Sequence, residues 1–176
     1  MVLPLRLRTV EARACWQVVV VGVSAAMSVT FACIAPFPAM AALAARTLSA
    51  RAAIVTLLAA VLANQAVGFC VLGYPRTFET AIWGPILALG TLAAFVVAGR
   101  IAQPVPAAVA AFAAYEAVLA VTSLVWQHSL ADFSLGIVGQ VALGNAAGLV
   151  VLGIVYLLMV AIERAAAPNG AEAAVS

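Results

Sequence analysis

Long, continuous apolar segments are the feature that most limits the fold of this chain. A helix of about 20 apolar residues spans the ~30 Å hydrocarbon core of a bilayer. Only 8% of the residues are charged and 67% are hydrophobic, so the chain cannot form the charged surface of a soluble domain. The apolar residues do not alternate with a period of two, which argues against an outer-membrane barrel. An all-α integral membrane protein is therefore expected, with long apolar segments at about 14–34, 51–72, 79–100, 105–126 and 134–162.

A shorter apolar stretch lies between the first two segments. Pro36-Phe37-Pro38 interrupts the helical pattern, because proline lacks an amide donor and restricts the residue before it. The pattern then resumes from Met40 to Ala45 and ends at Arg46. A helix over 36–48 would be about 20 Å long, which is less than the thickness of the hydrocarbon core. Whether this piece crosses the membrane decides on which side each arginine lies.

The arginines favour a crossing. Positively charged residues concentrate in cytoplasmic loops, and the chain has no lysine. If the short segment does not cross, the arginines divide four against four. If it crosses, only Arg76 lies opposite the other seven, which are Arg6, Arg8, Arg13, Arg46, Arg51, Arg100 and Arg164. The sequence therefore predicts six transmembrane helices, the second one short, with both termini in the cytoplasm. The predicted regions are an N-terminal arm (1–13), a membrane domain (14–164) and a disordered tail (165–176).

A signal peptide is the alternative interpretation of the first segment, because a basic start precedes an apolar core. The apolar run is long for a signal peptide, and Thr30-Phe31-Ala32-Cys33 is a poor lipoprotein cleavage motif. A retained transmembrane helix is therefore expected.

Polar side chains gather between Asn64 and Thr77, in a chain that has few of them. Polar groups inside a membrane usually line a cavity, because contact with hydrocarbon is costly. In the six-helix topology this stretch lies at the outer side, as does the loop after the fifth helix. We therefore predict an outward-facing substrate pocket, formed by Asn64, Gln65, Phe69, Cys70, Tyr74, Arg76, Trp83, Glu116, Trp126, His128 and Asn145.

Each of these residues also has a structural alternative. Glu116 can be a hydrogen-bonded structural residue, although an acid inside a membrane is a functional hypothesis by default. His128, in a loop, can simply be solvated, and Arg76 can pair with Glu79. Aromatic residues at helix ends are common in interfacial belts. Amide side chains can join helices by hydrogen bonds, and this alternative applies to Asn64, Gln65 and Asn145.

Cys70 lies four residues before Tyr74, within the polar stretch. A lone cysteine in a membrane helix is often only a small apolar residue, but a thiolate is a soft ligand suited to a transition metal. Cys33 is also expected near the outer end, so a Cys33–Cys70 disulfide stays open. Three scattered cysteines do not form a zinc site or a disulfide framework.

Asn64-Gln65-x-x-Gly68-Phe69 with Cys70, followed by Tyr74-Pro75 and Trp83-Gly84, resembles the BtuM family. BtuM proteins are small cobalamin transporters of Gram-negative bacteria, similar to the S components of energy-coupling-factor vitamin transporters. The resemblance implies an inner-membrane protein that binds cobalamin from the outer face, with Cys70 as a ligand of the corrinoid cobalt and Tyr74 beside it. It also implies slow removal of cyanide from cyanocobalamin, no prosthetic group, and an optional energising ATPase module as partner.

Other functional classes find less support in the sequence. It contains no P-loop, no GxGxxG motif after a strand, no CxxC and no serine–histidine–acid arrangement with supporting context, so an enzyme is not expected. The net charge of +2 sets topology and does not indicate nucleic-acid binding. Two alternatives stay open: an S component for another small vitamin, with a structural Cys70, and a membrane assembly subunit that docks through small-residue faces such as Gly144-x-x-x-Gly148. A thiol oxidoreductase is the least favoured, because no second cysteine lies at redox spacing.

Overall fold

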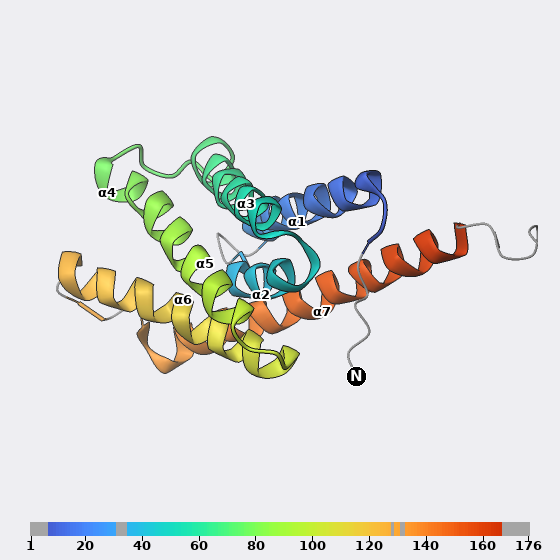
Figure 1. Ribbon diagram of the computed structural model, residues 1–176. Coiled ribbons are helices and arrows are strands. Elements are labelled where there is room, and N and C mark those ends of the chain that lie inside the picture. The colour runs from blue at the N-terminus through green and yellow to red at the C-terminus, as the bar shows by residue number, and fades with distance from the viewer. Residues whose placement is uncertain (1–6, 31–34, 128, 131–132, 167–176) are drawn as a thin grey trace, which may run out of the picture.

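The chain folds into a bundle of helices packed around one short helix (Figure 1). The computed structural model describes residues 7–30, 35–127, 129–130 and 133–166, and contains no strand within them. In chain order the helices are α1 (Val10–Thr30), α2 (Phe37–Thr47), α3 (Ala50–Cys70), α4 (Phe78–Ala81), α5 (Trp83–Gly99), α6 (Pro104–Gln127) and α7 (Leu135–Ala166). The predicted all-α fold is confirmed.

Five helical stretches in the described part of the chain are long and apolar enough to cross a membrane. Their outward faces carry large apolar side chains, and Val18, Leu62 and Leu143 are 71%, 69% and 76% exposed. Such faces suit contact with lipid acyl chains and not with water. The five stretches are Val10–Thr30, Ala50–Cys70, Phe78–Gly99, Pro104–Trp126 and Leu135–Ala166.

The boundaries of these helices differ from the predicted segments by a few residues. α1 begins at Val10 and so includes the last residues of the predicted N-terminal arm, and α7 continues to Ala166, beyond the predicted end at 162. Three predictions fall partly or wholly outside the described residues: the start of the arm, the disordered tail after 166, and a Cys33–Cys70 disulfide.

α2 is the short helix at the centre of the bundle (Figure 1). It contacts α3, α5, α6 and α7, and eight of its eleven residues are buried, including Phe37 and Met40. Eleven residues make a helix about 16 Å long, roughly half of the hydrocarbon thickness. Surrounding protein rather than lipid therefore covers the two ends of α2, which is where membrane proteins tolerate irregular backbone.

Hydrogen bonds between α1 and α3 show that these two helices run parallel. Three hydrogen bonds join α1 to α3: Gln17 with Thr56 at 2.8 Å, Ser24 with Ala60 at 2.9 Å, and Ser28 with Asn64 at 2.5 Å. The residue numbers rise together in both helices from one bond to the next. The chain must therefore turn back between α1 and α3. Trp16 Nε1 donates to Thr47 Oγ1 at 3.1 Å, which fixes the end of α2 beside the start of α1. α2 is thus the segment that returns the chain.

The two ends of the bundle differ in charge. Six of the seven described arginines lie near the ends of α2, α5 and α7 and the starts of α1, α3 and α6, and they are Arg8, Arg13, Arg46, Arg51, Arg100 and Arg164. We call this the arginine-rich end. Arg46 donates there to the carbonyls of Ile101 and Ala102, at 3.1 and 3.2 Å. Arg76, between α3 and α4, lies at the opposite, arginine-poor end.

The start of α1 and the end of α7 meet at the arginine-rich end. The Glu163 carboxylate accepts hydrogen bonds from the backbone amides of Arg8, at 2.8 Å, and Thr9, at 2.6 Å. These amides precede the first turn of α1 and have no carbonyl partner within the helix. Glu163 therefore holds the first and last long helices together at one end of the bundle.

Candidate functional site

Asn64 lies in the interface between α1 and α3 and is 1% exposed. Its Nδ2 donates to Ser28 Oγ at 2.5 Å, and the Ser28 hydroxyl donates to the Ser24 carbonyl at 2.7 Å. The Oδ1 atom is buried and has no hydrogen-bond partner among the described residues. The amide nitrogen of Asn64 thus joins two helices, and Asn64 is not among the residues that line the cavities beside Asn145 and Glu116.

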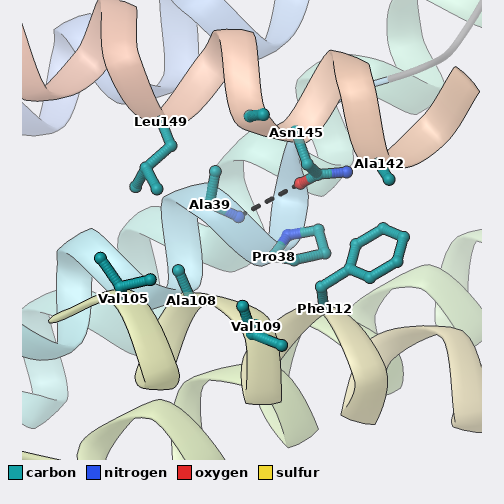
Figure 2. A pocket seen from close by; sticks show the side chains of 10 residues that line it. Pro38, Ala39, Val105, Ala108, Val109, Phe112, Ala142, Asn145 and Leu149 are labelled. Atoms are coloured by element: carbon teal, nitrogen blue, oxygen red, sulfur yellow. Dashed lines mark hydrogen bonds between the residues drawn. The ribbon is translucent and has the colours of Figure 1, made fainter. Parts of the chain in front are cut away.

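Asn145 caps the start of α2. Figure 2 shows its side chain pointing from α7 to Ala39. The Ala39 amide donates to Asn145 Oδ1 at 3.2 Å, while Asn145 Nδ2 donates to the Val141 carbonyl at 3.0 Å. The first turn of α2 presents few other donors, because prolines precede and follow Phe37 and the Phe37 amide bonds to the Ala35 carbonyl at 2.9 Å. Asn145 therefore supplies the acceptor that this helix start lacks.

A cavity of about 260 Å³ lies beside Asn145, between α2, α6 and α7 (Figure 2). Its walls are apolar, and Val105 and Val109 in them are 71% and 64% exposed on the outer face of α6. Both polar ends of Asn145 are already bonded within the protein. This cavity therefore offers little to orient a polar solute.

Two glycines of the polar stretch, Gly68 and Gly73, allow the chain to turn sharply at the end of α3. The Tyr74 ring lies over Gly68, where an added Cβ would come within 2.9 Å of Tyr74 Cδ2, and the Tyr74 amide donates to the Gly68 carbonyl at 3.0 Å. Gly73 has φ +69°, which glycine adopts without strain. Gln65 packs toward the start of α5, with its Cγ 3.5 Å from the position of a Cβ on Gly84. These residues shape the arginine-poor end of α3.

Cys70 is the last residue of α3, and its thiol is free and exposed. Arg76, in the following loop, is also exposed, whereas the neighbouring Phe69 is half-buried. At the same end of the bundle, the rings of Phe78 in α4 and Trp126 in α6 lie 6.3 Å apart between centroids. The arginine-poor end thus carries an accessible thiol, a guanidinium and an aromatic pair.

Glu116 and Trp83 line one cavity of about 220 Å³, between α5, α6 and α7. The Glu116 side chain is half-buried, and the described residues give it no hydrogen bond and no ion pair. The other lining residues are apolar or aromatic: Ala35, Leu87, Tyr115, Leu119, Phe133, Ile137, Val138 and Val141. We call this space the Glu116 cavity. Among the predicted site residues, these two are brought together by the structure.

Sequence reasoning did not single out Tyr115 and Phe133 as site residues. Gly90 on α5 explains the position of Tyr115, because a Cβ there would lie 2.9 Å from Leu119 Cδ1 and 3.0 Å from Tyr115 Cδ2. The absence of a side chain at Gly90 lets α6 approach α5 and sets the cavity wall. In the sequence, Tyr115 comes directly before Glu116 and Leu119 follows one helical turn after Tyr115. This spacing was the available signal that both residues could lie beside Glu116.

Two predictions remain, a ligand contact by His128 and a cobalt ligand at Cys70. His128 lies outside the described residues. No group of three or more His, Cys, Asp or Glu residues that could hold a metal ion occurs in the part of the chain with described coordinates. A corrin ring supplies the equatorial ligands of its own cobalt, so one thiolate would suffice for the ligation predicted at Cys70.

The fold and its apolar outer faces define a multi-pass helical membrane protein. Comparisons of the chain with family models, with curated proteins and with solved structures gave no match.

Proposed function

We propose that this chain is a six-span uptake protein of the bacterial inner membrane, with both termini in the cytoplasm, that binds a vitamin-class solute at its arginine-poor end. The parallel course of α1 and α3 supports an even number of crossings, because α2 carries the chain back between them. The Glu163 contact with the start of α1 supports termini on one side. The arginine distribution favours the arginine-rich end as the cytoplasmic one.

Single cysteines introduced into a cysteine-free variant test this topology. In the six-span arrangement, cysteines at Glu11 and Ser49 are labelled by a membrane-impermeant thiol reagent only from the cytoplasmic side, and a cysteine at Arg76 only from outside. All three positions are exposed. If α2 did not return the chain across the membrane, positions 11 and 76 would share one side and position 49 would lie on the other. That pattern would contradict the six-span proposal.

Cobalamin is the solute that the motif resemblance favours, with Cys70 as a ligand of cobalt. The observation that carries this proposal is the free, exposed thiol of Cys70 at the arginine-poor end. Arg76 nearby suits the phosphate of the nucleotide loop of cobalamin, since guanidinium matches phosphate geometry. Ligand cavities typically measure about 300–1,000 Å³, and the Glu116 cavity is smaller, at about 220 Å³. The corrin ring would therefore lie on the surface of the arginine-poor end, near Cys70, and an ATPase module remains an optional partner.

Removal of the Cys70 thiol is expected to abolish thiolate ligation of cobalt. Purified protein mixed with cyanocobalamin should shift the visible corrinoid spectrum as cyanide is displaced, and Cys70→Ala should show no such shift. Cys15→Ala is the matched control, because Cys15 is also a free, exposed cysteine but lies near the arginine-rich end. An unchanged spectral shift in Cys70→Ala, or the absence of any corrinoid binding by the unaltered protein, would refute the cobalamin proposal.

Uptake of a different, smaller vitamin-class solute is the second candidate. The specific observation in its favour is the Glu116 cavity, whose carboxylate has no hydrogen bond or ion pair with the described residues and whose lining does not include Cys70. In that case Cys70 is a structural residue, and Cys70→Ala leaves ligand binding unchanged. Stable co-purification with another membrane protein, together with no binding of any small solute, would instead favour an assembly subunit.

A further inference from the structure

We propose that the Glu116 cavity is a binding site for a small organic cation of the ammonium type. This inference rests on the uptake function proposed above, in its second form, and it names the chemical class of the solute. The residues that carry it are the carboxylate of Glu116 and the rings of Trp83, Tyr115 and Phe133, all of which line the cavity.

The carboxylate of Glu116 is the charged group in this lining. Glu116 lies twelve residues after the start of α6 and eleven before its end, so it is close to the middle of that helix. A charge at such depth is costly unless a partner compensates it. The elements packed around the carboxylate contribute Trp83 and Leu87 from α5 and Ile137, Val138 and Val141 from α7, and none of these is basic. A bound cation would supply the missing positive charge.

Aromatic side chains provide the second part of the recognition. Trp83 lies at the start of α5, Tyr115 precedes Glu116 on α6, and Phe133 lies just before α7. The face of an aromatic ring attracts a cation within about 6 Å, and tryptophan does so most strongly. A carboxylate that shares a cavity with aromatic rings is the combination that favours an organic ammonium ion over a neutral molecule of the same shape.

The size and the wall residues of the cavity further limit the class of ligand that can bind. A volume of about 220 Å³ corresponds to roughly seven water molecules at ~30 Å³ each. Leu119, Val138 and Val141 suit methyl or methylene groups on the ligand. Mg²⁺ and Ca²⁺ require several oxygen ligands, and the lining provides one carboxylate. The occupant is therefore a small alkylammonium ion rather than an inorganic dication.

Choline and its uncharged carbon analogue 3,3-dimethyl-1-butanol form a matched pair of probes for this proposal. Equilibrium dialysis against the purified full chain in lipid nanodiscs should detect choline binding and little binding of the alcohol. Glu116→Gln should weaken choline binding about a hundredfold or more, because it removes the charge that pairs with the cation. Trp83→Leu should weaken it about tenfold through the lost cation–π contact. Glu79→Gln, an exposed acid outside the cavity lining, should bind choline like the unaltered protein.

Equal binding of choline and the alcohol, no binding of choline, or unchanged choline binding in Glu116→Gln would each overturn the proposal. If Glu116→Gln does not fold, the Trp83→Leu variant and the comparison of the two probes decide the question. Cyanocobalamin binding, measured on the same preparation, separates the two proposals. Corrinoid binding without choline binding overturns only the cation site, and choline binding without corrinoid binding overturns only the cobalamin assignment.

Discussion

Replacing Gly148 with alanine is expected to disrupt the packing of α2 against α7 and to lower the free energy of unfolding by about 1–3 kcal/mol or more. Gly148 is buried on α7, facing the start of α2. A Cβ on Gly148 would lie 2.5 Å from Cβ and 2.6 Å from Cγ of Pro36. Both atoms belong to a closed ring that cannot rotate away, so the helices themselves must separate.

Gly153→Ala is the matched control for this substitution, because it lies on the same helix and an added Cβ there meets no atom within 4 Å. It should leave stability unchanged or raise it by up to about 1 kcal/mol, since alanine favours a helix over glycine. Unfolding of the purified variants in mild detergent with increasing denaturant provides the measurement. Equal stability of Gly148→Ala and Gly153→Ala would contradict the close approach of α7 to Pro36.

Replacing Asn145 with leucine is expected to leave the Ala39 amide without an acceptor inside the bundle. An unsatisfied buried donor costs about 1–3 kcal/mol, and lipid surroundings provide no water to replace the lost bond. The Ala39 amide should then exchange its hydrogen faster than in the unaltered protein, and the unfolding midpoint should fall. Amide hydrogen exchange and denaturant unfolding measure the two effects.

Gln140→Leu is the control for the Asn145 variant. Gln140 lies on the same helix and is exposed, so its replacement removes an amide without opening a buried bond. Gln140→Leu and Asn145→Leu could lose equal stability. That result would mean that a general change in the polarity of α7 causes the loss, and not the broken contact with α2.

The long helices could be predicted from the sequence because their signal is local. A continuous apolar segment of membrane-spanning length gives a helix whatever its neighbours are, and the predicted segments agree with α1, α3, α5, α6 and α7 to within a few residues. The break at the two prolines predicted a short helix there, and the structure begins α2 at Phe37. Its place at the centre of the bundle depends on contacts with four other helices, which no local pattern contains.

The candidate site could be predicted only in part, because the sequence shows where a polar residue is but not which group it bonds to in the fold. Asn64 bonds to Ser28, 36 positions away, and Asn145 to Ala39, 106 positions away. From the sequence, both amides were equally consistent with a ligand and with another helix. Trp83 and Glu116 were predicted to share a pocket, and they do line one cavity. Tyr115 was missed because its direction depends on how closely α6 approaches α5 at Gly90.

The central place of α2 has a consequence for biosynthesis. The ribosome completes α2 before any of α5, α6 and α7 exists, yet those three helices form most of its surroundings. An eleven-residue segment is too short to be stable alone across a bilayer. In the six-span arrangement proposed above, we therefore expect α2 to take its final position only after the C-terminal half has entered the membrane, so that insertion of the chain ends with its second helix rather than its last.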